Sequence, residues 1–129
     1  MFKVRVGKVS ALTLILIGIT LGVLGQLSFK RGMTNIGMIN VSDLFSAKIL
    51  SIITEKFVIL GVLLYAITAG LWMVILSQEE LSFAYPLLAL GYVFAAVLAK
   101  IFFNETLTLF KILGILFIVA GAYLIVLKI

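Results

Sequence analysis

The chain contains neither cysteine nor histidine. This absence excludes disulfide bonds, thiolate and imidazole metal ligands, and Ser–His or Cys–His catalytic pairs. Charged residues make up only 12% of the sequence, against about 25% in soluble domains. The sequence has no glycine-rich phosphate loop and no acidic cluster suited to Mg²⁺. We therefore expect neither an enzyme nor a protein that carries a metal or another cofactor.

Hydrophobic residues, in contrast, account for 64% of the 129 residues and gather in long continuous runs. A helix that crosses a bilayer needs about 20 mostly apolar residues. Four runs meet this requirement: Ala11–Phe29, Phe57–Leu76, Ser82–Phe103 and Leu107–Leu127. Their continuity is not the alternating pattern of a membrane β-barrel. The sequence therefore predicts an all-α, multi-pass membrane protein in which residues 1–129 form one four-span domain.

The first run follows three basic residues, Lys3, Arg5 and Lys8, as the apolar part of a signal peptide does. No small-x-small cleavage site follows it, and the run is long enough to span a membrane. We interpret it as a transmembrane helix, with cleavage as the alternative. The net charge of +5 indicates contact with lipid phosphates rather than nucleic acid, because the bases lie at the ends of the runs.

The connections between the runs differ in length. Residues 77–81 and 104–106 form short turns, which require neighbouring helices to be antiparallel. The first connection is longer, and its residues 42–53 have apolar side chains at helical spacing. Ser42 is a candidate N-cap, and Asp43 suits a positive helix start. We predict a short amphipathic helix at the membrane surface, with a plain segment re-entering the membrane as the alternative.

Charge gives only a weak indication of orientation. With four spans, one side of the membrane carries four bases and the other carries six. The first group is Lys3, Arg5, Lys8 and Lys128, and the second is Lys30, Arg31, Lys48, Lys56, Lys100 and Lys111. The positive-inside rule slightly favours a cytoplasmic location for the second group, and insertion in both orientations is the alternative. We expect the chain to lie in the inner cell membrane.

Polar groups within the spans are candidates for function, because an unpartnered polar group in hydrocarbon is costly. Gly18, Gly22, Gln26 and Lys30 follow one another at steps of four on one helix face. This face is either a packing surface for a neighbouring helix or the wall of a cleft with Gln26 and Lys30 near its mouth. The two interpretations are compatible.

Further candidates for substrate binding lie in the second and third runs. Tyr65, Thr68 and Trp72 share one face, and Tyr85 and Tyr92 share another. We predict that these groups line a cavity. Thr68 alternatively bonds its own helix backbone, and Trp72 alternatively anchors the helix at the membrane interface.

The remaining distinctive residues lie at the span ends and in the fourth run. Lys100 either snorkels to the interface or meets an anionic headgroup. Pro86, the single proline, is tolerated near the start of its run but is able to bend it. Glu105 precedes the fourth run, where its charge suits a helix N-terminus.

A set of small residues in the fourth run predicts a helix-packing seam with another copy or chain. The seam residues are Gly114, Ala120 and Gly121.

Four segments together resemble a known transporter group. They are Gly25–Lys30, Leu81–Leu90, Phe102–Glu105 and Gly114–Gly121. They resemble four-span, EamA-like members of the drug/metabolite transporter superfamily, and in particular the small subunits of aminoarabinose-phosphoundecaprenol flippases. The resemblance covers nearly the whole chain. It implies a lipid-linked sugar as substrate. We expect a dimer with an identical or sister four-span chain.

The chain is also similar to the small multidrug resistance proteins. Tyr65, Thr68 and Tyr85 fall where that family lines its substrate pocket. The family's essential glutamate in the first span corresponds here to Gly22, and its tryptophan in the third span corresponds to Leu88. No carboxylate lies deep in any of the four runs. The resemblance therefore implies the fold and the dimer, but not proton-coupled export of cations.

We therefore predict a transporter or flippase subunit that moves an amphipathic anion, such as a polyprenyl-phosphate sugar, between leaflets. Lys30, Arg31 and Lys100 would attract the phosphate. The groups expected to bond the sugar are Gln26, Tyr65, Thr68, Tyr85 and Tyr92. One alternative is an exporter of cations or metabolites with a cation–π cage. The cage residues are Tyr65, Trp72, Tyr85 and Tyr92. Another alternative is a partner subunit that does not itself transport.

Overall fold

A computed structural model of the protein describes residues 8–127, with side chains described from Ala11 onward. Four helical segments within this part are long and apolar enough to cross a membrane. They are α1 (Lys8–Ile36), α3 (Lys56–Gln78), the segment Leu81–Phe103, and α6 (Leu109–Val126). The prediction of an all-α membrane protein with four spans is confirmed. The predicted contributions of Lys3, Arg5, Lys128 and the Lys8 side chain lie outside the described residues.

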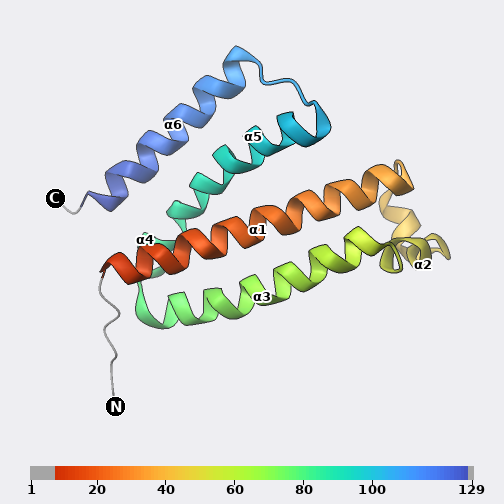
Figure 1. Ribbon diagram of the computed structural model, residues 1–129, viewed down its shortest axis with the longest axis horizontal. Helices are drawn as coiled ribbons and strands as arrows, with labels where there is room; N and C mark the ends of the chain where they lie inside the picture. Colours follow the sequence, from red (N-terminus) through yellow and green to blue (C-terminus); the bar gives the residue numbers. More distant parts are fainter. Residues whose placement is uncertain (1–7, 128–129) are drawn as a thin grey trace.

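Helices α1 and α3 form a long antiparallel pair (Figure 1). Glycines allow the two backbones to approach closely, because each accommodates a larger side chain from the other helix. A Cβ atom at Gly61 would lie 2.7 Å from Phe29 Cδ1, and one at Gly25 would lie 2.9 Å from Tyr65 Cδ2. The ring of Phe29 stacks on that of Tyr65, with centroids 5.3 Å apart. The predicted packing surface at Gly18 and Gly22 also faces α3, since Cβ atoms there would lie 3.5 Å from Trp72 Nε1 and 3.8 Å from Thr68 Cγ2. This part of the prediction is confirmed.

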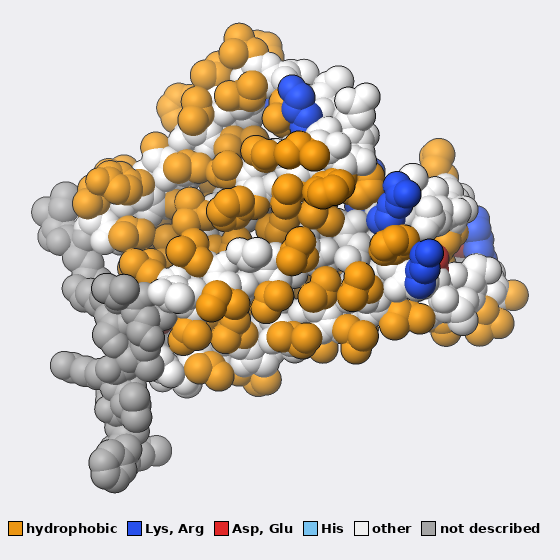
Figure 2. Space-filling model, viewed as in Figure 1, with side chains coloured by type: hydrophobic (Ala, Val, Ile, Leu, Met, Phe, Trp, Pro, Cys, Tyr) orange, Lys and Arg blue, Asp and Glu red, His pale blue; other side chains and the backbone are white. Residues whose placement is uncertain are grey.

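The buried core lies towards the end of the bundle where α1 begins and α3 ends. Its members come from α1, from the end of α3 and from the start of the third span, and are Ile15, Ile19, Val23, Ile75, Ala84 and Leu87. The span-forming helices otherwise expose most of their apolar side chains (Figure 2). This distribution is expected of a bundle whose solvent is hydrocarbon, because apolar side chains need not be hidden from lipid.

The third span is interrupted near its start. It consists of α4 (Leu81–Ala84), a 3₁₀ turn η2 (Pro86–Ala89) and α5 (Leu90–Phe103). Proline at the first position of η2 lacks an N–H and disfavours a continuous α-helix. The disturbance at Pro86 is therefore a short 3₁₀ turn within the span, and the flanking Tyr85 and Leu90 keep helical backbone angles. Beyond it, α5 packs on α1 at Gly91, where an added Cβ would lie 3.2 Å from Ile19 Cγ2, and then diverges from α1 (Figure 1).

Helix α1 continues past Phe29 to Ile36, because no residue before Gly37 interrupts it. Gly37 has φ +93°, a conformation that glycine adopts at helix ends without steric cost. Its N–H donates to the carbonyl oxygen of Met33 at 2.8 Å. The last turns of α1 therefore carry Lys30 and Arg31 on regular helix.

The connection after α1 contains the predicted short helix, divided into η1 (Val41–Phe45) and α2 (Lys48–Ile53). The prediction of Ser42 as N-cap is wrong. Asn40 is the cap, and its backbone N–H donates to Asp43 Oδ2 at 2.8 Å. This hydrogen bond, together with the nearby charge of Lys48, lowers the pKa of Asp43 despite some burial. Extended backbone at Ser46 (φ −112°, ψ 174°) separates the two turns.

The N-terminus of α3 is joined to the end of α1 through Glu55. Its Oε2 accepts hydrogen bonds from the N–H groups of Phe57 at 2.7 Å and Val58 at 2.9 Å, and its Oε1 accepts one from Asn35 at 3.2 Å. Burial alone would raise the pKa of Glu55, but these donors and the neighbouring Lys56 lower it. Gly32 leaves room for the carboxylate, since a Cβ there would lie 2.5 Å from Oε2.

Helix α6 is the least packed span. Among its residues Leu109–Val126, only Ala122 is buried. Its N-cap is Thr108, whose hydroxyl accepts from the N–H of Lys111 at 3.3 Å. Glu105, whose charge is expected to suit this helix start, makes no cap hydrogen bond among those described and pairs with Lys30 instead. Asn104 turns the chain at the end of α5 with φ 52° and ψ 35°, and Glu105 is directed to the end of α1.

Candidate functional site

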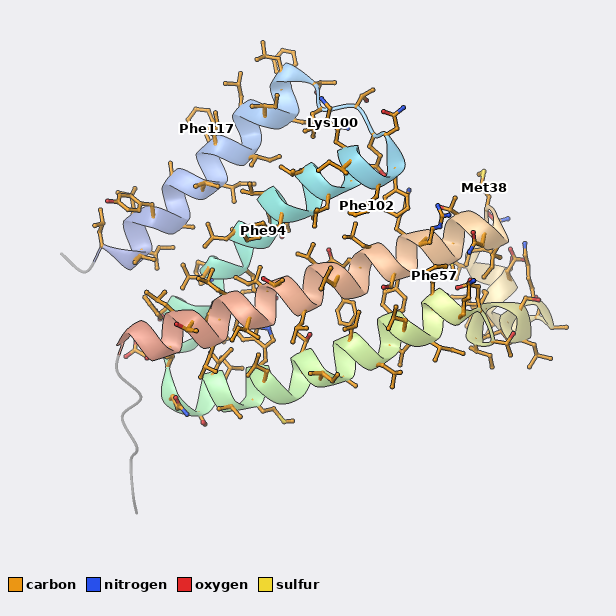
Figure 3. All side chains as sticks on the ribbon, in the orientation of Figure 1. Met38, Phe57, Phe94, Lys100, Phe102 and Phe117 are labelled. Carbon is orange, nitrogen blue, oxygen red and sulfur yellow. The ribbon has the colours of Figure 1, made fainter. Side chains whose placement is uncertain are left out.

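An open cleft of about 530 Å³ lies between α1, α3 and the end of α5, and we call it the α1–α3–α5 cleft. Seven of its nine lining residues are apolar. The lining comprises Leu24, Leu27, Ser28 and Arg31 of α1, Phe57, Leu60 and Leu64 of α3, and Phe102 and Phe103 of α5. In Figure 3, Phe57 and Phe102 lie on either side of the C-terminal half of α1. Its volume is in the range of small-molecule sites, roughly 300–1,000 Å³.

The cleft has a polar end and an apolar end. Along α1 it runs from Leu24 to Arg31, and along the antiparallel α3 it runs from Leu64 back to Phe57. Each stretch corresponds to about 10 Å of helix axis. Arg31 and Phe57 lie near the ends of the spans Ala11–Ile36 and Lys56–Gln78, whereas Leu24 and Leu64 lie further from those ends. If these spans cross the bilayer, the cleft is expected to lead from the headgroup level into the apolar layer.

Arg31 is the one charged residue in this lining. It has neither an ion pair nor a side-chain hydrogen bond within the part of the chain that the structure describes. Three nearby lysines do have partners. Lys30 pairs with Glu105 at 3.5 Å, Lys48 pairs with Asp43 at 3.4 Å, and Lys111 donates to the carbonyl oxygen of Thr106 at 3.0 Å. The guanidinium of Arg31 therefore remains available to an anion.

Gln26 and Lys30 lie on a different face of α1 from the cleft. Both are exposed, and neither contributes to the cleft lining. Lys30 instead contacts Glu105 in the loop between α5 and α6. The predicted polar stripe therefore does not form one wall of this cleft, because the steps of four place Gln26 and Lys30 away from Arg31 around the helix.

The predicted stripe on α3 lies in the seam with α1. Tyr65 stacks on Phe29, and Trp72 Nε1 lies 3.5 Å from the Cβ position of Gly18. Thr68 is buried and donates to the carbonyl oxygen of Leu64, four residues earlier, at 2.7 Å. The alternative interpretation of Thr68, a bond to its own helix, is confirmed. These three side chains come together, but as packing between two helices.

The candidates in the third span are exposed and spread along its length. Tyr85 lies at the break before η2, Tyr92 lies in the first turn of α5, and Lys100 lies in its last turn. The exposed fractions of the two tyrosines are 63% and 60%. None of these three side chains lines the cleft. A role in substrate binding remains a prediction for Gln26, Lys30, Tyr65, Thr68, Trp72, Tyr85, Tyr92 and Lys100.

A second cavity of about 300 Å³ lies between α5 and α6, near the loop that joins them. Glu105, Thr106 and Lys111 form its polar part, and Gly114 is among its apolar lining. A Cβ added at Gly114 or at Gly121 would meet nothing within 4 Å, and Ala120 is exposed. The residues predicted as a seam are therefore uncovered in the single chain.

Sequence inspection selected Arg31 but missed the other residues of the cleft. Leu24, Ser28 and Arg31 follow one another at steps of four and three, which is a helix-face signal. This sequence signal for a binding face is weak. The Ser28 hydroxyl donates to the carbonyl oxygen of Leu24 at 2.9 Å, as that of an ordinary helical serine does. Phe57, Phe102 and Phe103 look like any apolar residues at span ends. Only the divergence of α5 from α1 gives them a shared space.

The chain is similar to known membrane transporters. Residues 47–127 match the EamA-like transporter family. Three similar proteins bear the name "probable 4-amino-4-deoxy-L-arabinose-phosphoundecaprenol flippase subunit ArnF". That of Photorhabdus laumondii subsp. laumondii is 33% identical over 115 residues, covering 85% of this chain and 91% of its own. That of Serratia proteamaculans is 37% identical over 108 residues, covering 79% and 81%. That of Proteus mirabilis is 39% identical over 77 residues, covering 58% of each chain. No solved structure matches the chain.

Proposed function

Because this chain belongs to the EamA-like transporter family, we propose that it is a flippase subunit whose substrate is a lipid-linked anionic sugar. Its relatives are named for a phosphoundecaprenol carrying an amino sugar, and a substrate of the same class suits the present chain. Such a molecule has a polar, charged headgroup and a long hydrocarbon chain. A flippase has to move the headgroup while the chain stays in the bilayer.

The distribution of charge is the observation that carries this proposal. The Lys and Arg side chains that the structure describes all lie at one end of the bundle, where α1 ends, α3 begins and α5 meets α6 (Figure 2). The apolar segments Ala11–Ile36, Lys56–Gln78, Leu81–Phe103 and Leu109–Val126 contain no carboxylate. Cations at the headgroup level attract phosphate, with Lys30, Arg31 and Lys100 as the expected contributors. Spans without a carboxylate offer no acidic relay for proton-driven export of a cation.

We also propose that the working unit contains a second four-span chain. Helix α6 leaves Gly114, Ala120 and Gly121 uncovered, and small residues of this kind allow close helix contact in membranes. A single bundle of four helices also gives a thin wall around a transport path. The partner is either an identical chain or a sister subunit, in keeping with relatives that are named as subunits.

The test is a translocation assay in reconstituted vesicles. The full chain is co-purified with whatever four-span partner it retains, and a labelled undecaprenyl-phosphate amino sugar is placed in one leaflet. We expect protein-dependent appearance of the headgroup in the other leaflet, which an impermeant amine reagent detects. Vesicles containing an unrelated four-span protein serve as the control. Equal translocation in both vesicle types would overturn the proposal.

A further inference from the structure

We propose that the α1–α3–α5 cleft is the binding site for the phosphate and the adjoining isoprenoid units of a polyprenyl monophosphate. Arg31 binds the phosphate, and the apolar lining holds the chain. This assignment rests on the proposed function, because it takes the substrate to be a lipid-linked phosphate. Neither the family match nor the relatives' names assign a site to these residues.

Charge complementarity identifies the headgroup. The Arg31 guanidinium has no partner among residues 8–127, while the neighbouring Lys30 is held by Glu105. A guanidinium binds phosphate through two parallel hydrogen bonds in a fixed plane, which an ammonium group does not reproduce. Arg31 also lies beside Ser28, whose hydroxyl is the other polar group of the lining. A phosphate at this position neutralises a cation that the protein itself leaves unpaired.

The shape and lining of the cleft identify the chain. From Arg31 the cleft leads along Leu27 and Leu24 of α1, opposite Leu60 and Leu64 of α3. Its depth of about 10 Å along the helix axes runs into the hydrocarbon layer. Because the cleft is open on the flank of the bundle, a chain enters it sideways without leaving the bilayer.

The lipid that surrounds the cleft limits which contacts can provide affinity for the substrate. Moving a hydrocarbon chain from lipid into an apolar cleft gains little hydrophobic free energy, because both environments are apolar. Selectivity must therefore come from the Arg31–phosphate contact and from how well one chain packs against the walls. The lining holds a single cation with no partner among the described residues, which matches a monophosphate, and we commit to a single-chain lipid of this kind rather than to two-chain phospholipids.

Photocrosslinking in membranes tests the site. The probe is an undecaprenyl monophosphate with a diazirine on the isoprenoid unit nearest the phosphate, and the target is the full chain with its natural partner. We expect labelled peptides from Leu24–Arg31, Phe57–Leu64 and Phe102–Phe103. Labelling that maps to the outer face of α6 or to the α1–α3 seam would overturn the assignment.

Matched variants separate the headgroup contact from the chain contact. We expect Arg31→Gln to lower labelling roughly tenfold or more, as loss of a charge-assisted contact does. Arg31→Lys should recover only part of it. Leu60→Trp fills the groove and should lower labelling with Arg31 intact.

Lys48→Gln removes a cation from the same end of the bundle, outside the cleft, and should leave labelling unchanged. An equal loss with Lys48→Gln would show that only general surface charge matters and would overturn the site.

Competition distinguishes the possible sources of phosphate. Unlabelled undecaprenyl phosphate should block labelling, whereas phosphatidylglycerol and inorganic phosphate at the same concentration should not. Equal competition by phosphatidylglycerol would overturn the single-chain selectivity, and competition by inorganic phosphate would overturn the role of the apolar lining.

If translocation occurs while labelling maps elsewhere, the site fails and the proposed function stands. If the cleft is labelled but no translocation occurs, the proposed function fails and the site stands.

Discussion

The ammonium nitrogen of Lys30 lies 3.5 Å from Oε1 of Glu105. This ion pair joins the last turns of α1 to the loop after α5, which are the two elements that diverge to form the mouth of the α1–α3–α5 cleft. Both side chains remain substantially exposed, at 56% and 45%. An exposed pair of this kind is screened by solvent and contributes little to stability. The pair therefore links the two elements only weakly.

A double-mutant cycle measures the strength of this ion pair. Lys30→Ala, Glu105→Ala and the double variant should give a coupling free energy of about 0.2–1 kcal/mol in reversible unfolding in mixed detergent micelles. Added salt should reduce the coupling. A coupling of several kcal/mol that is insensitive to salt would instead indicate a buried, structural ion pair.

Glycines in the α1–α3 seam should not tolerate a methyl group. Gly61→Ala would place Cβ 2.7 Å from Phe29 Cδ1 and 3.1 Å from the carbonyl oxygen of Gly25, so the helices must move apart. We expect destabilisation of roughly 1–3 kcal/mol, as for other overpacked sites, seen as a lower midpoint in detergent unfolding. Gly70→Ala is the matched control, because a Cβ there meets nothing within 4 Å. Equal effects of the two changes would contradict the seam.

A substitution at Thr68 tests whether its side chain serves helix packing or substrate binding. Its hydroxyl donates to the carbonyl oxygen of Leu64 within α3, and valine has nearly the same shape without a hydroxyl. We expect Thr68→Val to leave translocation unchanged and to lower stability by no more than the net contribution of one hydrogen bond, roughly 0.5–1.5 kcal/mol. A selective loss of transport in a protein of normal stability would show that the hydroxyl contacts substrate, as first predicted from the sequence.

The junction between α1 and α3 should loosen in acid. The pKa of Glu55 is below its ordinary value of 4.5 in the folded chain, so its contribution is complete above about pH 4.5. The contribution is lost as pH falls through the lower, folded pKa. We expect the amides of Phe57 and Val58 to lose hydrogen-exchange protection in that range, after correction for intrinsic rates. Glu55→Gln removes the titrating group and should abolish this pH dependence.

The connection between α1 and α3 should contact the bilayer surface. Met38 and Phe45 have exposed fractions of 98% and 89%, and such apolar side chains beside the spans are expected to enter the interface. In a Trp72→Phe background, Phe45→Trp should give a blue-shifted fluorescence that lipids brominated near the headgroup quench. Ser42→Trp, on the same segment, is the comparison and should be quenched less. Equal, weak quenching of both would place the segment in water.

Long apolar runs made the four spans predictable, because length and hydropathy alone decide which segments enter a bilayer. The short helix after α1 was also predictable from its spacing, but its cap was not. Ser42 and Asn40 are both good capping residues, and the geometry of Asp43 with the Asn40 backbone determines which one is used. The site was the least predictable part. Periodicity places Tyr65, Thr68 and Trp72 on one face of a helix, but it does not show whether that face meets a neighbour or a space.

By itself, the sequence determined that this is a helical membrane protein, that its chemistry involves no cysteine or histidine, and that its spans lack carboxylates. It also determined that glycines recur along one face of α1. Only the tertiary structure decided that this glycine face is occupied by α3, and that Arg31 shares a cleft with residues of α3 and α5. The physical reason is that a cleft in a helical membrane protein depends on interhelical angles. Those angles arise from contacts between residues far apart in the chain, such as Gly25 with Tyr65 and Gly91 with Ile19.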